Sequence, residues 1–251
     1  DPDHPMVFGA DLFLWFMGFL IVMGFVVIPN SAYNALAQEM RDRTFELVVI
    51  TPLTPARILR GKLGSAMAQS CLYASAIVPF MVFTYFLGGI DILTVLFCMV
   101  LAFLATILLT LFALFAASFA YKHAPRMGGA LLAMALVGAA IGAIGLSISI
   151  VHFNVAQEYL QNFFKKEVLL GTGTVLFVAV TYGALFFTVA CTQLTFDSAN
   201  RSTPVRIVLA VQCVGWLALM TGVFIVSGRD DEVLMALTAF PLAQFFIAGI
   251  F

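Results

Sequence analysis

Residues 92–120 read ILTVLFCMVLAFLATILLTLFALFAASFA and contain no charged side chain. The hydrocarbon core of a bilayer is about 30 Å thick, and a helix needs roughly 20 apolar residues to cross it. The run is continuously apolar, whereas a strand of a membrane barrel would alternate apolar and polar residues over about ten positions. This stretch therefore predicts a membrane-spanning α-helix.

The whole chain has the composition that such helices require. Of its 251 residues, 63% are hydrophobic and 10% are charged, whereas a soluble domain is about 45–50% apolar and about 25% charged. So few charges cannot cover a water-facing surface, and the surplus apolar surface must face a lipid bilayer. The net charge of -1 gives no electrostatic basis for a nucleic-acid partner.

We predict an all-α, polytopic transmembrane helical bundle of about seven spans, forming one membrane domain over residues 1–251. The expected spans are Asp11–Ser31, Leu63–Leu87, Ile92–Ala120, Gly128–Val151, Leu169–Leu194, Val205–Val226 and Val233–Phe251. The chain begins at Asp1 and ends inside an apolar run, and both ends resemble cuts through a longer protein.

Basic residues between the spans predict the orientation. Nine lie on one side: Arg41, Arg43, Arg57, Arg60, Lys62, Lys122, Arg126, Arg201 and Arg206. Three lie on the other side: Lys165, Lys166 and Arg229. Because the side richer in Lys and Arg faces the cytoplasm, residues 32–62 are expected to be cytoplasmic and residues 152–168 extracytoplasmic.

The outer segment, HFNVAQEYLQNFFKKE at residues 152–167, has apolar side chains at helix-like spacing among polar ones. These side chains are Phe153, Val155, Tyr159, Leu160, Phe163 and Phe164. The pattern favours a short helix lying in the outer membrane interface. A plain loop with aromatic anchors is the alternative.

The predicted spans contain almost no ionisable side chain, which disfavours several functions. A proton-driven carrier usually has Asp, Glu or His at mid-membrane depth, and an intramembrane hydrolase needs a nucleophile with a base. We therefore expect no catalytic, cofactor-binding or metal-binding residue in this chain, and the energy for any work to come from a cytoplasmic partner. The cysteines lie within apolar runs and are expected to be unpaired: Cys71, Cys98, Cys191 and Cys213.

The cytoplasmic segment reads AQEMRDRTFELVVITPLTPARILRGKLGSA over residues 37–66. Residues 39–50 can form a short helix that places Leu47, Val48 and Ile50 outside the membrane, where they need a protein surface to cover them. The prolines that follow break this helix. Thr54 is a suitable N-cap, with Pro55 at the first position of the next helix.

That next helix is expected to enter the bilayer at Lys62, so that Arg57, Arg60 and Lys62 are anchors at the headgroups. Two interpretations of the whole segment remain open. It is either an ordinary amphipathic connection or a rigid lever that carries displacement from a docked partner into the next span.

The same segment resembles the signature region of ABC-2-type ABC transporter permeases, whose pattern is close to GT-x-E-L-L-x-x-T-P-L-S-x-x-x-I-x-x-G-K. The matching residues are Glu39, Thr44, Glu46, Leu47, Thr51, Pro52, Leu53, Ile58, Gly61 and Lys62. Pro79-Phe80, Leu87-Gly88-Gly89 and the long third span to Ser118 are also similar to the family. Asp42-Arg43 departs from the pattern, because the family often has a Gly there.

The resemblance covers residues 32–118, and the remainder matches by hydropathy alone. The family usually begins with a cytoplasmic amphipathic helix and one more span, so the first span here corresponds to the family's second. Residues 152–167 correspond to the family's extracellular helices. The two spans from Val205 onward lie beyond the usual six-span unit.

The resemblance implies a permease subunit of an ATP-driven exporter in a bacterial plasma (inner) membrane. ATP and Mg would be bound by a separate cytoplasmic ATP-binding subunit, because this chain has no GxxxxGK[ST] loop, and a second permease subunit, identical or different, would complete the transporter. This chain would then not be an enzyme. The residues implied in ATPase coupling are Glu39, Arg41, Arg43, Thr44, Glu46, Leu47, Val48, Ile50, Thr51, Pro52 and Leu53.

Three other functions remain as alternatives. A non-transporting structural or assembly subunit would keep the permease scaffold without turnover. A secondary carrier would need an ion site, for example near Gly142, Gly145 and Ser147, where small residues are more simply explained by close helix packing. A membrane enzyme is the weakest alternative, because the spacing of His152, Glu158 and Glu167 forms no recognisable metal site.

The orientation can be tested by cysteine labelling in a chain from which the four natural cysteines have been removed. We expect the Gln157→Cys variant to react with a membrane-impermeant maleimide in intact cells, because position 157 is predicted outside. The Arg57→Cys variant should react only after permeabilisation. The reverse pattern of labelling would contradict the predicted orientation.

Overall fold

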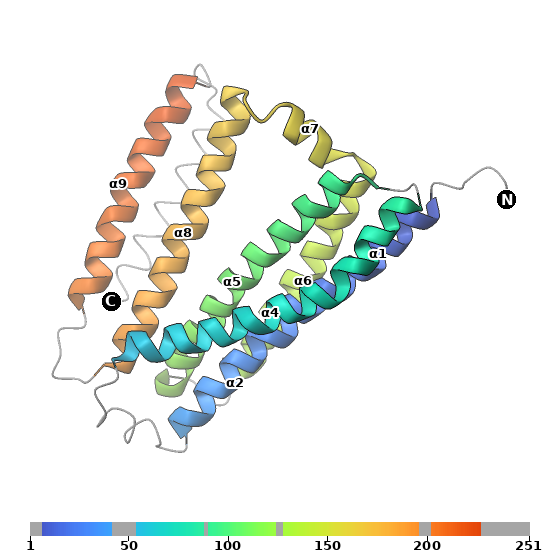
Figure 1. The fold of residues 1–251 in the computed structure, drawn as a ribbon. Helices are drawn as coiled ribbons and strands as arrows, with labels where there is room; N and C mark the ends of the chain where they lie inside the picture. The colour runs from blue at the N-terminus through green and yellow to red at the C-terminus, as the bar shows by residue number, and fades with distance from the viewer. Residues whose placement is uncertain (1–6, 42–53, 88–89, 124–127, 196–201, 227–251) are drawn as a thin grey trace. The chain divides into compact units, whose positions relative to one another are not determined.

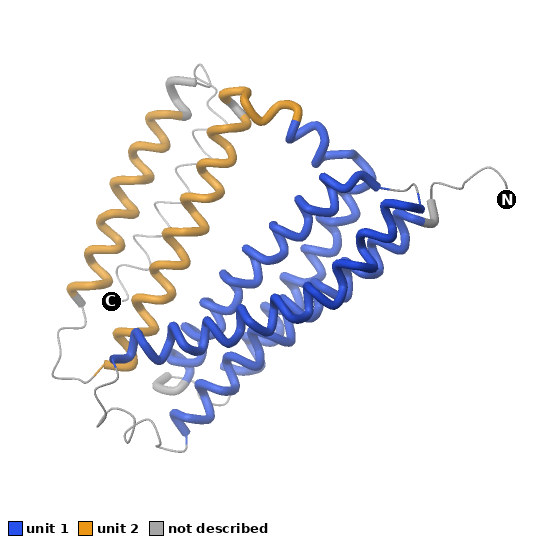
Figure 2. The backbone as a smooth tube through the Cα atoms, in the orientation of Figure 1, with its two compact units in different colours: residues 1–160 blue, residues 161–251 orange. Residues whose placement is uncertain are grey.

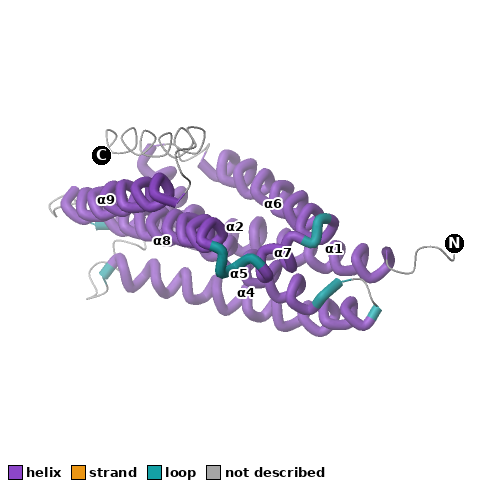
Figure 3. Tube along the Cα trace, turned by 90° about the horizontal axis from the view of Figure 1, so that it is seen from above, coloured by secondary structure: helices purple, strands orange, loops and turns teal. Residues whose placement is uncertain are grey.

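The computed structural model describes residues 7–41, 54–87, 90–123, 128–195 and 202–226 (Figure 1). Every regular element within these ranges is helical, and Figure 3 shows only short turns between helices in the described part. The elements are α1 (Val7–Val22), the π-helical turn η1 (Met23–Val27), α2 (Ile28–Arg41), α4 (Pro55–Phe86), α5 (Ile92–His123), α6 (Gly128–His152), α7 (Val155–Gln161), α8 (Lys166–Leu194) and α9 (Ser202–Val226).

Six helices of the described residues are long and apolar enough to cross a membrane. They are Gly9–Arg41, Pro55–Phe86, Ile92–Ala120, Gly128–His152, Val168–Leu194 and Thr203–Gly222. This confirms the prediction of an all-helical integral membrane protein for six of the expected spans. The seventh expected span, Val233–Phe251, lies outside the described residues.

The chain divides into two compact units, residues 1–160 and residues 161–251 (Figure 2). The described part of the first unit contains α1 to α6 and most of α7. The described part of the second is built on α8 and α9, which pack against each other.

The first helix is longer than the sequence predicts. We expected the span to end at Ser31, but the helix continues through α2 to Arg41. The polar residues of α2, such as Asn34 and Gln38, are exposed on one face. The opposite face is buried and packs chiefly along α5: Ala32, Tyr33, Leu36, Ala37 and Met40. A mean hydropathy cannot detect such a helix, because the two faces cancel.

One core cluster joins four helices of the first unit. Phe13, Met17 and Ile21 of α1 and Phe25 of η1 are buried in it. Their neighbours from other helices are Ile77, Met81, Val95, Cys98, Ala102 and Ala140. Lipid tails are as apolar as these side chains, so association of the helices depends on close packing rather than on exclusion of water. The small Ala102 and Ala140 fit this requirement.

Gly24 lies at a close approach of the first helix to α5. A Cβ atom at this position would lie 2.6 Å from Oγ1 of Thr106. Gly24 belongs to the π-helical turn η1, where the helix is locally wider than an α-helix. The absence of a side chain at Gly24 therefore allows two backbones to approach each other beside an irregular turn.

A second close contact joins α2, α5 and α6. A Cβ atom at Gly128 would overlap Cβ of Ala120 and would lie 3.3 Å from the Tyr33 hydroxyl. Tyr33 is 6% exposed, and its ring also lies against Gly129. Through these contacts α2 packs against both α5 and α6.

Residues 152–167 contain a short helix, which is the part of the first sequence interpretation that concerns the backbone. The backbone reverses at Asn154, whose φ of 48° lies in the left-handed region that Asn tolerates better than most residues. Helix α7 follows, and its Tyr159 packs on Phe97 of α5 with the ring centroids 5.4 Å apart. Phe153 and Phe164 remain exposed.

The second unit is a helical hairpin joined by aromatic and polar contacts. Phe177 of α8 meets Trp216 of α9 edge to face, with the ring centroids 5.9 Å apart. Gly215 allows this contact, because a Cβ there would overlap the Phe177 ring. Nε2 of the buried Gln212 lies 3.5 Å from Oγ1 of Thr181, which adds a weak polar link between the two helices.

The Gly24→Ala substitution should destabilise the protein, because it places a methyl group against the Thr106 hydroxyl. Overpacking of this kind costs about 1–3 kcal/mol, whereas the higher helix propensity of Ala returns at most about 1 kcal/mol. We expect a lower thermal unfolding midpoint in detergent, and recovery when Thr106→Ala is added. Gly18→Ala is the matched control, since nothing lies within 4 Å of its Cβ position. Equal midpoints for the Gly18 and Gly24 variants would contradict this packing.

Candidate functional site

The candidate site lies where α2 ends and α4 begins. Glu39 and Arg41 occupy the last turn of α2. Arg57, Arg60 and Lys62 lie in the first two turns of α4. The remaining predicted coupling residues lie outside the described residues: Arg43, Thr44, Glu46, Leu47, Val48, Ile50, Thr51, Pro52 and Leu53. The structure therefore describes the two helix ends that flank residues 42–53.

An ion pair connects these helix ends. Nζ of Lys62 donates a hydrogen bond to Oε1 of Glu39 over 2.8 Å. The Lys62 side chain is 15% exposed and the Glu39 side chain 46% exposed, so solvent screens the attraction. Exposed pairs of this type stabilise a protein by about 1 kcal/mol or less. The pair nevertheless joins residues 23 positions apart and closes the base of the intervening segment.

The sequence predicts Glu39 in a docking helix and Lys62 at the headgroups, but it does not predict that the two side chains pair. Lys62 is the least exposed of the three basic residues on α4, whereas Arg57 and Arg60 are exposed. The opposite charges of Glu39 and Lys62, on either side of residues 42–53, are the feature of the sequence that could have indicated this ion pair. However, the pairing depends on α2 continuing to Arg41, which the hydropathy did not reveal.

The end of α2 carries its own stabilising contact. Nε of Arg41 donates a hydrogen bond to the carbonyl oxygen of Ala37 over 3.3 Å. The last carbonyls of a helix have no partner within the helix, and its C-terminus carries partial negative charge. Arg41 therefore satisfies part of the helix end, which is a local role beside the coupling role that the resemblance implies.

The beginning of α4 is as predicted in its backbone but not in its side-chain contact. Thr54 is the N-cap with extended backbone, and Pro55 is at the first helical position. The carbonyl oxygen of Thr54 accepts from the amides of Arg57 and Ile58 at 2.9 and 3.3 Å. The Thr54 hydroxyl makes no capping hydrogen bond. Leu59, near the start of the same helix, is fully buried.

The two helices that end at the site continue into the packed part of the first unit. Leu36 is fully buried and Met40 is 6% exposed, so the packed face of α2 reaches to within one residue of Glu39. Helix α4 is uninterrupted from Pro55 to Phe86, with Pro79 inside it. A force applied at the ends of α2 and α4 would therefore act on two helices that extend across the apolar zone.

The described residues contain no cluster of metal-ligating side chains. Within the ranges that the structure covers, no three of His, Cys, Asp and Glu lie close enough together to hold a metal ion. His152 and Glu158 are both exposed near α7. Comparison with protein-family models, with curated protein sequences and with solved structures finds no match to this chain.

Charge reversal should test the ion pair in the purified chain. Lys62→Glu places two carboxylates together, so we expect the free energy of unfolding in detergent to fall by about 0.5–1 kcal/mol. Adding Glu39→Lys should restore most of this loss, and salt near 1 M should reduce the difference because it screens exposed charges.

Arg60→Glu is the matched control, since Arg60 is exposed on the same helix. Reversal there should have a smaller effect that Glu39→Lys does not correct. Additive effects of the Glu39 and Lys62 substitutions would argue against a direct pair.

Proposed function

We propose that this chain is the membrane-spanning permease subunit of an ATP-driven ABC transporter. A separate cytoplasmic ATPase subunit would bind ATP and Mg, dock on residues 39–53, and drive export of a lipophilic substrate. The observation that carries the proposal is the Glu39–Lys62 pair of 2.8 Å at the base of the segment that resembles the ABC-2 coupling region.

The geometry of the flanking helices supports this proposal. Residues 42–53 connect α2 to α4 in the sequence, and the ion pair links the two helix ends that flank them. A partner that moves this segment would therefore displace α2 and α4 jointly. Because α2 packs along α5 and touches the start of α6 through Tyr33, the displacement would reach four helices of the first unit.

The polar groups buried in the described spans supply a second argument. Those whose contacts are defined in α5 and α6 bond to their own helix: Thr106 to the carbonyl of Ala102, Thr110 to that of Thr106, Ser118 to that of Phe115, and Ser147 to that of Ala143. Hydroxyls satisfied in this way contribute no charge for an ion pathway. This favours energy input through a partner over a mid-membrane relay of ionisable groups.

A transporter of this type needs two membrane subunits, so a second permease, identical or different, belongs to the proposal. The bacterial inner membrane is the proposed location, with residues 32–62 cytoplasmic and residues 152–168 extracytoplasmic. The exposed Phe153 and Phe164 beside α7 suit the outer interface, where aromatic side chains are favoured.

Purification from the native membrane in mild detergent should recover an ATP-hydrolysing subunit with this chain. Leu47→Asp places a charge in the apolar patch proposed to dock, so we expect association to weaken by at least roughly 30-fold, as for an interface hot spot. Glu46→Lys should also weaken it. The readouts are co-purification and the ATPase rate of the reconstituted complex.

Leu160→Asp is the matched control, since it makes the same chemical change in the outer segment and should leave association intact. If no ATPase is recovered and neither Leu47→Asp nor Glu46→Lys has any effect, the proposal fails. Recovery of other membrane proteins in a complex without nucleotide-dependent change would instead support a structural or assembly subunit.

A further inference from the structure

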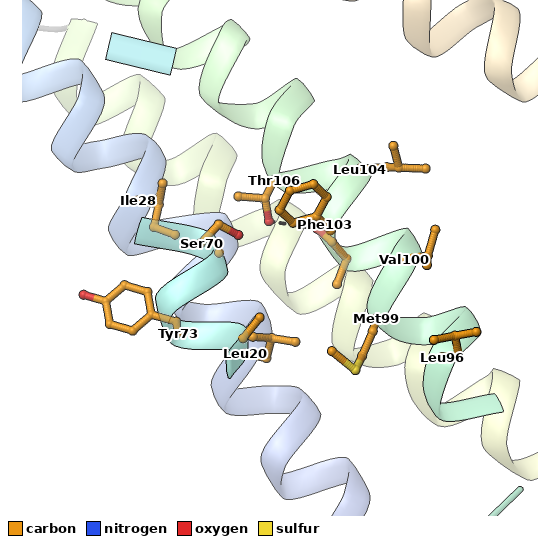
Figure 4. A pocket seen from close by; sticks show the side chains of 13 residues that line it. Leu20, Ile28, Ser70, Tyr73, Leu96, Met99, Val100, Phe103, Leu104 and Thr106 are labelled. Carbon is orange, nitrogen blue, oxygen red and sulfur yellow. Dashed lines mark hydrogen bonds between the residues drawn. The ribbon is translucent and has the colours of Figure 1, made fainter. Parts of the chain in front are cut away.

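A cavity of about 280 Å³ lies within the first unit, between the first helix, α4 and α5 (Figure 4). Its floor is formed by Leu20, Gly24 and Ile28, which are spaced by one turn along the first helix. The floor therefore includes the π-helical turn and the glycine that allows close approach to Thr106. Widened turns of this type occur frequently at functional sites.

The cavity opens sideways. Leu96, Val100 and Leu104 follow one side of α5 at its edge (Figure 4), and they are 60%, 52% and 43% exposed. On the opposite wall, Tyr73 of α4 is 38% exposed. Its rim is thus made of exposed apolar and aromatic side chains.

The depth of the cavity follows from the helix rise of about 1.5 Å per residue. On α4, residues 70–74 are about 12–18 Å from Lys62 and about 20–26 Å from Leu87. On α5, Val100 and Phe103 are about 14–18 Å from Asp91. Because the hydrocarbon core is about 30 Å thick, the cavity lies at the depth of the middle of the bilayer, where acyl chains are the solvent.

The chemistry of the lining excludes a charged ligand. No lining residue is ionisable at neutral pH, and most of the lining is apolar. The Thr106 hydroxyl is already bonded to the carbonyl of Ala102 over 2.8 Å, and Ser70 is 7% exposed. A headgroup or an ion would lose its hydration here without gaining charged partners.

The size fits a chain rather than a small solvent molecule. The volume of this cavity is about twice the ~150 Å³ of an apolar cavity that holds benzene. By that comparison, the cavity has room for roughly ten carbon atoms. An empty apolar cavity forfeits dispersion contacts along its whole lining. A flexible hydrocarbon chain that enters from the side restores these contacts without disturbing the helices.

We propose that this cavity is a lateral binding site for one acyl chain of a membrane lipid. The chain enters between α4 and α5 and lies against the π-helical turn of the first helix. The inference depends on the membrane location of the unit and not on coupling to an ATPase. It therefore stands or falls separately from the transport proposal.

The test uses the full chain in nanodiscs of phosphatidylcholine that contain a small fraction of phosphatidylcholine with a photoreactive diazirine on one acyl chain. We expect labelling to concentrate in peptides that contain residues 70–74 and 96–104. The labelling should be strongest when the diazirine is near the middle or end of the chain, and at least about 5-fold weaker when it is next to the headgroup.

Ala74→Phe fills the cavity from α4 and should reduce labelling of residues 96–104 at least about 5-fold. Ala76→Phe is the matched control, because Ala76 is exposed on the same helix and does not line the cavity. Labelling spread evenly over all lipid-facing peptides of the unsubstituted chain would overturn the proposal. So would equal labelling of the two variants when both are folded and monodisperse.

Another occupant would give a different pattern. If a helix of a second copy or of residues 161–251 fills the cavity, cysteines placed at Val100 and Leu104 in a chain without natural cysteines will form protein crosslinks, and lipid labelling of this region will be absent. That result would also overturn the acyl-chain site.

Discussion

The close packing of the first helix on α5 is the contact on which the rest of the first unit depends. At one level Gly24 lies against Thr106, and further along Leu36 and Met40 are buried in the same groove between helices. In lipid there is no water to exclude, so such contacts gain their energy from dispersion and from the small residues that permit them. The core cluster, the cavity and the paired helix ends are all arranged around this seam.

The seam also explains why the helix ends at Glu39 and Lys62 can be held in position. One face of α2 remains buried as far as Met40 in its last turn, and Leu59 near the start of α4 is fully buried. An exposed ion pair alone is too weak to orient two long helices. The ion pair is a local link between helix ends that packing has already brought together. Residues 42–53 therefore connect two helices that are buried on one face.

The same packing leaves a cavity beside the π-helical turn. A bilayer protein can retain such a gap, because acyl chains are available to fill it, whereas a soluble core would lose contacts. Both proposals made for this molecule therefore use one helix. The end of this helix, in α2, leads into the segment proposed to bind an ATPase subunit. The middle of the helix, at η1, borders the cavity proposed to bind an acyl chain.

The sequence by itself determined that the chain is helical and membrane-embedded, because spans such as Ile92–Ala120 are too long and apolar for another environment. It also predicted the start of α4 at Thr54 and Pro55, since proline and capping preferences are local, and it favoured the short helix near Tyr159. It missed the extension of the first helix to Arg41, because the polar face of α2 masks its apolar face in an averaged hydropathy.

Only the tertiary structure decided which side chains meet. The Glu39–Lys62 pair, the contact of Gly24 with Thr106 and the cavity between α4 and α5 join residues far apart in the chain. Their positions depend on the rotation and offset of whole helices. In a chain where nearly every face is apolar, periodicity does not fix those rotations, so the detailed fit of side chains in three dimensions has to do so.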